Sequence, residues 1–531
     1  MLDNQMGYVK QTALAALAAL AVIATPAQAG EVVVVDGGKA KRVQDPAVPS
    51  RAEIELGMPV GGAGPLGFAA SASSARTARA SRESARAARA WRTARSSSKR
   101  GRRAVYRTLS RELRRTKIAS TDYRRWRRYY VLAIRALRKL RGARLTQLRY
   151  VTDSVEALAL ARRLTPTRMP VAFLQLERNR QYWRKLPYPA AGDQISFSGS
   201  QILFQYFPGE GLQLHPLSTF KKANHLHGFC ERAEPTCDQI ALRTLLDEMT
   251  ALAVKRGRGF IAWEYLFHFG GGAPPWMSGM AQATGIQALA RAAQLLGQPA
   301  YLETARSALG AFETLPPTGV RATGPAGGIH YLQYSFAPRL WIFNAFLQSL
   351  IGLHDFAQIA GDERARGLYA EAEPEAREEL PLSDVGDWSR YSYAGAESSY
   401  DYHELLREFL QSMCSRRLGP LYCDYARRYR GYQVDPPVLT YEGPELATEG
   451  QPAPIAFTVS KLSAVELTIY RGAKLVYSRL ATFRRGSGSF DWTPKGPGLY
   501  SVSLGAKELR TGLGKKDRAG AEVEVTNAPG Q

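Results

Sequence analysis

The stretch LWIFNAFLQSLIGL, residues 340–353, is a largely apolar run that has the amide side chain of Asn344 near its start. It predicts the first part of an apolar helix over residues 340–360. A polar amide inside such a helix must find hydrogen-bond partners or cost about 1–3 kcal/mol. Asn344 is therefore a candidate functional residue.

Amphipathic helices are expected on both sides of this run, joined by short loops rich in Gly and Pro, over residues 236–256, 276–296, 299–315 and 363–379. Helix pairs with short connections predict an α/α toroid (an incomplete α/α barrel) over residues 187–432. Two polar loops meet these helices, GEGLQLHPLSTFKKAN (209–224) and FHFGGGAPPWMSGMAQ (267–282). Such loops are where functional sites usually lie.

The flanking segments have different patterns, so the chain is predicted to be multidomain. Residues 1–29 have a lysine, a short apolar run and an Ala-Gln-Ala cleavage pattern, which predicts a signal peptide and a secreted or envelope-associated protein. Residues 30–75 are predicted to be a flexible linker and residues 76–186 a basic helical region. From residue 433 to 531 the apolar period becomes two, which predicts an all-β Ig-like sandwich with an accessory role.

The four cysteines are interpreted through the predicted export. They lie in two close pairs, Cys230 with Cys237 and Cys414 with Cys423. An even number in an oxidising compartment predicts disulfides, and of the three possible connectivities we favour the two short loops. The sequence has no P-loop, no H-E-x-x-H motif and no paired C-x2-C motif, so no metal or cofactor is expected.

The positive charge is concentrated in one segment. The net charge is +24, and residues 76–144 contain 25 Lys and Arg against three acidic residues. An exported protein with such a segment is expected to bind an anionic cell-wall polymer or membrane surface. Nucleic acid is a disfavoured partner because of the export, and the oligomeric state is not indicated.

Tyrosine residues are also concentrated in one segment of the sequence. DWSRYSYAGAESSYDYHELLREF, residues 387–409, contains Tyr391 and Tyr402, the latter beside His403. A buried phenol is commonly a packing group with a hydrogen-bonded tip. Phenols with shifted pKa values also move protons, and the stretch is then a reaction centre. The candidates for binding the hydroxyls and a carboxylate of a substrate are His215, Lys222, Asn224, Gln333, Asn344 and His403.

Residues 276–432 resemble the C-terminal domain of the D-glucuronyl C5-epimerases, which convert glucuronic to iduronic acid in heparan sulfate precursors. The resemblance rests on PPWMSGMAQATGIQALARA (274–292), YLQYSFAPRLWIFNAFLQSLIGLHD (331–355) and SSYDYHELLREFL (398–410). It implies that Tyr391 and Tyr402 are the two tyrosines on which activity depends, and that Tyr334 and Asn344 lie in the substrate site. Tyr334 is the third catalytic candidate.

The chain departs from the family pattern in three places. Gln333 stands where the family has an acidic residue, and Ala394 stands where it has an arginine. The β-rich part that precedes this domain in the eukaryotic enzymes is expected to have no counterpart, because the basic helices stand there instead.

The implied reaction removes a proton α to a carboxylate and returns one to the opposite face of the sugar. It needs a base, an acid across the ring and donors for the enolate-like charge. A phenol has a pKa near 10, so His403 or Arg390 is expected to lower that of one tyrosine. The sequence thus predicts an isomerase acting on an anionic polysaccharide. Two alternatives are a polysaccharide lyase, which shares the first step, and a non-catalytic cell-wall glycan-binding protein.

Overall fold

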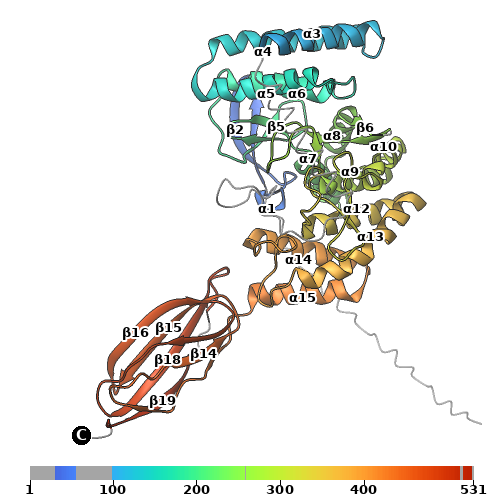
Figure 1. Ribbon diagram of the computed structural model, residues 1–531. Helices are drawn as coiled ribbons and strands as arrows, with labels where there is room; N and C mark the ends of the chain where they lie inside the picture. The colour runs from blue at the N-terminus through green and yellow to red at the C-terminus, as the bar shows by residue number, and fades with distance from the viewer. Residues whose placement is uncertain (1–29, 55–97, 258, 515–517, 529–531) are drawn as a thin grey trace, which may run out of the picture.

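The computed structural model describes residues 30–54, 98–257, 259–514 and 518–528 (Figure 1). The predicted signal peptide and residues 55–97 lie outside this part of the chain. Four helices of the basic region begin the long described segment, α3 (Ser98–Arg114), α4 (Ser120–Lys139), α5 (Gly142–Leu160) and α6 (Met169–Trp183). Trp126 of α4 stacks on Phe173 of α6 with 5.8 Å between ring centroids, and the Tyr130 hydroxyl donates to Glu156. These contacts pack α4 against its two neighbours.

A five-stranded sheet lies next to these helices, and its first two strands correct the predicted linker. The strands are β1 (Gly30–Asp36), β2 (Lys39–Asp45), β3 (Gln194–Phe197), β4 (Phe204–Phe207) and β5 (Gly211–Leu214), in the order β2-β1-β3-β4-β5. β1 is parallel to β3 and antiparallel to β2. Residues 30–54, which end in the short helix α1 (Arg51–Ile54), are therefore structured. A sheet therefore precedes the helical domain. The resemblance had led us to expect basic helices and no β-rich part at this place.

The middle of the chain is a layered array of helices, which confirms its predicted helical character. Its helices are α7 (Pro216–Glu231), α8 (Gln239–Ala251), α9 (Gly279–Leu296), α10 (Ala300–Ala308), α11 (Gly310–Glu313), α12 (Phe343–Ala360), α13 (Glu363–Leu382), α14 (Tyr400–Ser415) and α15 (Pro420–Val434). Packing runs from α7 to α9, α9 to α12, and α12 to α13 and α14. One apolar core continues from Val33 to Tyr429, so the expected boundary at residue 186 does not separate two cores.

Short two-stranded pairs connect several of these helices: β6 (Val254–Arg256) with β7 (Phe260–Ala262), β8 (Glu264–Tyr265) with β9 (Trp276–Met277), and β10 (Arg321–Thr323) with β11 (Ile329–Tyr331). The disulfides Cys230–Cys237 and Cys414–Cys423 close the two short loops, which confirms the favoured connectivity. Among the described residues, no helix has the length and apolar content needed to cross a bilayer.

The C-terminal region forms two sheets around a separate apolar core. One sheet contains β12 (Leu439–Tyr441), β14 (Ile455–Val459) and β17 (Gly486–Phe490). The other contains β13 (Leu446–Thr448), β19 (Ala519–Thr526), β18 (Gly498–Glu508), β15 (Ser463–Arg471) and β16 (Lys474–Phe483), in that order. Alternate residues of β14 and β15 are buried in the shared core, as expected from their period of two. The Ig-like designation of this β-domain stays a prediction.

Helices α9 and α12 approach closely because Gly352 presents no side chain. A Cβ atom added there would lie 2.5 Å from the carbonyl oxygen of Ala283 in α9. We predict that Gly352→Ala lowers the free energy of unfolding by about 1–3 kcal/mol, because backbone atoms must move apart to admit the methyl group. Chemical denaturation measures this loss.

Gly367→Ala is the matched control, since Gly367 lies in α13 with nothing within 4 Å of the added Cβ atom. Removing this helical glycine should stabilise the protein by up to about 1 kcal/mol. Equal effects of the two substitutions would contradict the close-approach argument.

Candidate active site

Three tyrosines from separate segments meet in the helical domain. Tyr334 follows β11, Tyr391 lies between α13 and α14, and Tyr402 is in the first turn of α14. The ring centroids of Tyr391 and Tyr402 are 4.6 Å apart. Burial raises the pKa of Tyr334 well above 10, and the neighbouring Tyr391 and Tyr402 phenols raise it further. The structure thus brings together the three residues predicted to be catalytic.

The shape of this cluster differs from the expected one in a specific way. Two tyrosines facing each other across a sugar must leave room for a pyranose ring between them. At 4.6 Å between centroids, with planes inclined by 52°, the Tyr391 and Tyr402 rings are instead in direct contact. In this arrangement a pyranose ring does not fit between the two phenols.

Tyr391 is carried by a small hairpin, residues 388–398. The Ser398 N–H donates to the Ser389 carbonyl oxygen at 2.8 Å, and the Tyr391 N–H donates to Ala396 at 3.1 Å. Ala394 at the tip has φ +51°, a left-handed conformation that few L-residues adopt, and this helps the chain reverse. Directly after the hairpin, Ser399 caps α14 by accepting from the Tyr402 N–H. The hairpin and the cap therefore place Tyr391 and Tyr402 together.

The hairpin is docked on the start of α12. The Tyr393 N–H donates to the Trp341 carbonyl oxygen at 2.9 Å, and the Phe343 N–H donates to Tyr391 at 3.4 Å. Asn344 is the next residue and only 5% of it is exposed. Within the described part of the chain, no hydrogen-bond partner is assigned to its side-chain amide. An amide in that state is available to a ligand, and Asn344 keeps its place as a candidate site residue.

An aromatic wall surrounds the Tyr334 ring. Phe336 stacks on it at 5.3 Å between centroids, and Phe269 and Trp276 contact it at 5.4 and 5.7 Å. The Tyr334 hydroxyl is buried without a hydrogen bond of normal geometry to any described residue, although it interacts with Tyr391. This apolar setting disfavours the phenolate and keeps Tyr334 protonated.

His403, by contrast, is a structural residue. Its ring stacks on Trp388 at 3.7 Å, its Nδ1 contacts the Ser389 hydroxyl at 2.8 Å, and its Nε2–H donates to the Tyr429 carbonyl oxygen at 3.0 Å. Burial lowers the pKa of His403 to about 4, so the ring is neutral near pH 7. The hypothesis that His403 supplies positive charge to a phenol is therefore wrong.

Arg390 and Gln333 also have protein partners. The Arg390 guanidinium donates to the Gly395 carbonyl oxygen at 2.9 Å and holds the hairpin tip. Gln333, one residue before Tyr334, accepts from the Ser278 hydroxyl at 3.2 Å. Gln333 therefore supports the Tyr334 segment from inside the fold.

The remaining predicted binding residues lie in α7 or at its start. Their side chains bond to protein groups in or around that helix. His215 caps α7 by accepting from the Ser218 N–H, and burial lowers the pKa of His215 to about 3. Lys222 donates to Gln201 at 2.8 Å, and Asn224 accepts from Arg291 at 3.0 Å. These contacts explain Lys222 and Asn224 without a ligand, whereas the buried Nε2 of His215 has no hydrogen-bond partner among the described residues.

A basic cleft adjoins the aromatic wall and was missed from the sequence. It has a volume of about 240 Å³, and Trp276 and Phe336 line it together with Arg163, Arg168, Lys255 and Arg256. Buried Glu264 pairs with Arg168 at 2.6 Å and with Arg256 at 2.8 Å. Burial alone would raise the pKa of Glu264, but the two guanidinium groups hold it below its usual range. One carboxylate among four cations leaves the cleft positive.

No single stretch of the sequence indicates this cleft, because its cations come from two separate segments. One segment precedes α6 and the other is β6. No cluster of His, Cys, Asp and Glu suited to a metal ion occurs in the described ranges. The site thus offers phenols, one amide and a positive rim. This set of groups fits proton transfer on an anionic sugar.

Residues 257–431 match the family model of the D-glucuronyl C5-epimerase C-terminus. The chain is also 29% identical over 178 residues to a D-glucuronyl C5-epimerase of Caenorhabditis elegans, covering 30% of this chain and 29% of that enzyme. The match to an uncharacterized protein of Methanocaldococcus jannaschii is 25% identical over 190 residues, or 35% of this chain and 62% of that protein. Residues 257–431 therefore carry the C-terminal domain of the D-glucuronyl C5-epimerase family.

Solved structures give weaker matches. An endo-β-1,4-glucanase from Acetobacter xylinum matches with a TM-score of 0.30 and 13% identity, covering 43% of this chain and 72% of that one. The CARDB domain of a Pyrococcus furiosus protein matches with a TM-score of 0.14 and 19% identity, covering 17% and 96%. Such TM-scores carry no argument about fold or function.

The buried position of Tyr334 predicts its titration. We expect Tyr334 to keep its proton beyond pH 10, where free tyrosine titrates, because the aromatic wall and the neighbouring phenols disfavour its anion. NMR of protein with ¹³C-labelled tyrosine ring carbons measures this, with the signal assigned by its loss in Tyr334→Phe. A Tyr334 signal that titrates at pH 10 or below would contradict the buried, protonated assignment.

Proposed function

We propose that the protein is a uronyl C5-epimerase-like enzyme that removes and returns the C5 proton of a hexuronic acid residue in an anionic polysaccharide. The observation that carries the proposal is the meeting of Tyr334, Tyr391 and Tyr402 inside the segment that matches the epimerase domain. We further propose that the helical domain is an α/α toroid and that the protein is extracytoplasmic. Its two disulfides are consistent with an oxidising compartment.

Among the three phenols, we assign the base to Tyr391. Tyr334 keeps its proton beside Tyr391, and we propose that its hydroxyl donates to the Tyr391 phenolate when that anion forms. This contact replaces the role expected of His403. Tyr402 then returns the proton, which requires the touching Tyr391 and Tyr402 rings to separate around the sugar.

The basic cleft is the place for a negative charge on the substrate. Lys255 and Arg163 lie at its rim without a carboxylate partner in the described residues, while Arg168 and Arg256 share Glu264. The cleft borders the wall that holds Tyr334, so a sugar carboxylate bound there lies near the phenols. Positive groups in such a position also disperse the charge that develops when C5 is deprotonated.

Deuterium incorporation tests this function. The protein, incubated with an unsulfated uronic-acid polymer in heavy water, should place deuterium at C5 without forming an unsaturated product. Tyr391→Phe and Tyr402→Phe should each slow incorporation by about 10²–10⁴-fold, the usual contribution of one acid or base. NMR of the recovered sugar gives the rate.

Tyr400→Phe is the control, because Tyr400 lies in the same turn of α14 with 46% of its surface exposed. It should keep the full rate. An unsaturated product would identify a lyase. Binding of the polymer with no deuterium incorporation would identify a non-catalytic glycan-binding protein.

A second part of the proposal concerns the basic helices, which we propose hold the protein on an anionic polymer of the cell envelope. On α4, exposed Arg124, Arg127, Arg128 and Arg135 line a hollow of about 400 Å³ together with Tyr123 and Leu132. These four arginines have no ion pair among the described residues. Their charge is therefore available to a partner.

Salt should weaken this attachment. We predict that the protein leaves an anionic polysaccharide column as salt is raised toward 1 M, where the screening length falls to about 3 Å. Arg127→Gln/Arg128→Gln should elute at lower salt than Arg366→Gln/Arg427→Gln, a pair with the same charge change but with ion-paired arginines. Equal elution of the two variants would remove α4 from the proposal. Stronger retention on anionic vesicles than on the polymer would point to the membrane surface.

A further inference from the structure

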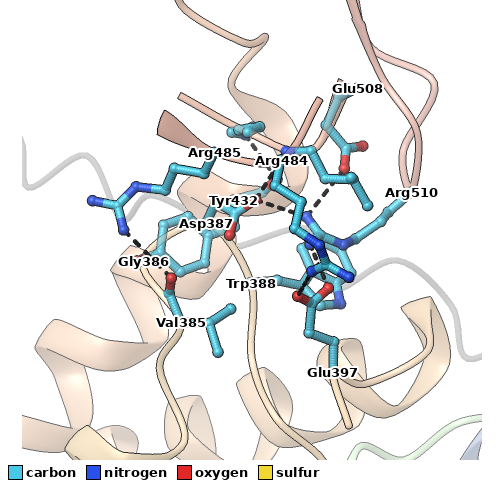
Figure 2. Close-up of polar contacts among 12 residues, drawn as sticks. Val385, Gly386, Asp387, Trp388, Glu397, Tyr432, Arg484, Arg485, Glu508 and Arg510 are labelled. Atoms are coloured by element: carbon cyan, nitrogen blue, oxygen red, sulfur yellow. Dashed lines mark hydrogen bonds and ion pairs between the residues drawn. The ribbon is translucent and has the colours of Figure 1, made fainter. Parts of the chain in front are cut away.

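The β-domain contacts the tyrosine hairpin, and its Arg510 bonds to both legs of that hairpin. Arg510, just after β18, donates to Asp387 at 3.0 Å and to Glu397 at 2.6 Å (Figure 2). Its guanidinium also lies 5.2 Å from the centroid of the Trp388 ring. Asp387 precedes the hairpin and Glu397 lies in its second strand. Arg510 therefore joins the two legs of the hairpin from another domain.

Further contacts from the β-domain reach the same segment. The Leu462 N–H donates to Asp387 at 3.0 Å, and Arg484 pairs with Glu397 at 3.2 Å. Arg485 contacts the Val385 carbonyl oxygen, as Figure 2 also shows. Lys461 donates to the Tyr432 carbonyl oxygen at 2.9 Å, at the end of α15. The β-domain is thus fixed to the foot of the hairpin and to the helix that supports it.

The two carboxylates are adjacent in sequence to residues that hold the tyrosine segments in place. Glu397 follows Ala396, which accepts the Tyr391 N–H, and precedes by two residues Ser399, the cap of α14. Asp387 precedes Trp388, whose indole N–H donates to Ser398 at 2.8 Å and closes the foot of the hairpin. A shift of Glu397 relative to Asp387 would therefore move Tyr391 and the first turn of α14.

We propose that Arg510 is a positioning residue for the tyrosine site, and that the β-domain is a working part of the enzyme. As far as activity is concerned, this inference rests on the proposed function. Arg510 and Asp387 are 12% and 6% exposed, so the pair is largely removed from water. Charge-assisted hydrogen bonds in such a setting are directional and hold a fixed geometry. They fix the foot of the hairpin.

The test compares three full-length variants. Arg510→Gln removes the charge that joins the two legs, Arg510→Lys keeps the charge without the planar fork, and Arg518→Gln is the control. Arg518 pairs with Glu466 inside the β-domain, at 45% and 44% exposure, and this pair does not contact the hairpin. Amide hydrogen exchange is followed in the peptides that cover residues 387–402, together with kcat and KM for C5 deuterium incorporation.

In Arg510→Gln we expect exchange of the hairpin amides to rise by at least roughly tenfold while β-domain peptides are unchanged. The kcat should fall by roughly 10–100-fold with a smaller change in KM, because small displacements of reacting groups are costly. Arg510→Lys should recover part of both losses, and Arg518→Gln should match the wild type.

Unchanged hairpin exchange in Arg510→Gln would overturn the inference. So would a loss of kcat without a change in exchange. If Arg510→Gln does not fold, Glu397→Gln loosens the same bridge from the hairpin side and decides the question by the same exchange measurement. Hydrogen exchange does not depend on activity. A wild-type protein that incorporates no deuterium would therefore refute the proposed function while the positioning inference is still decided.

Discussion

The hairpin of residues 388–398 has few apolar side chains of its own to bury, so its shape depends on hydrogen bonds from its neighbours. His403 provides the central one, because its ring stacks on Trp388 and its two nitrogens join Ser389 to the backbone of α15. A histidine that is buried, neutral and bonded at both nitrogens links these elements in a defined arrangement. The tyrosine cluster depends on this placement, since Tyr391 is in the hairpin and Tyr402 precedes His403 in α14.

Burial distinguishes Tyr334 from the other two phenols of the cluster. Tyr334 lies behind the pair in an aromatic wall, where its anion is strongly disfavoured. A neutral phenol at that depth can donate a hydrogen bond to a neighbouring anion, and this is the role proposed for Tyr334 beside Tyr391. The proposed assignment does not use His403, which is neutral, or Arg390, which is bonded to the hairpin tip.

The parts that could be predicted from the sequence are those with short-range signals. The two disulfides follow from close spacing, and Tyr391 and Tyr402 follow from a motif within one segment. The strand β1 was missed because its valines follow a predicted cleavage site, while its partner β3 begins at Gln194. His215 and Lys222 are residue types that often bind ligands. Only the fold shows that each has a hydrogen-bond partner inside the protein. Nothing in the local sequence of Arg510 relates it to Asp387.

The arginines of this molecule fall into two groups, those paired with a carboxylate and those without an ion pair among the described residues. Interior arginines are matched with carboxylates, as in Arg416 with Asp355 and Arg168 with Glu264. Such pairs fix geometry, and one buried carboxylate often holds two guanidinium groups. The arginines of α4 are exposed, and those that line its hollow are not ion-paired within the described chain. An unpaired surface charge attracts over a distance set by salt, whereas a buried pair acts only through contact. The proposed retention by the basic helices and the proposed positioning by Arg510 are therefore separable properties, although both depend on arginine side chains.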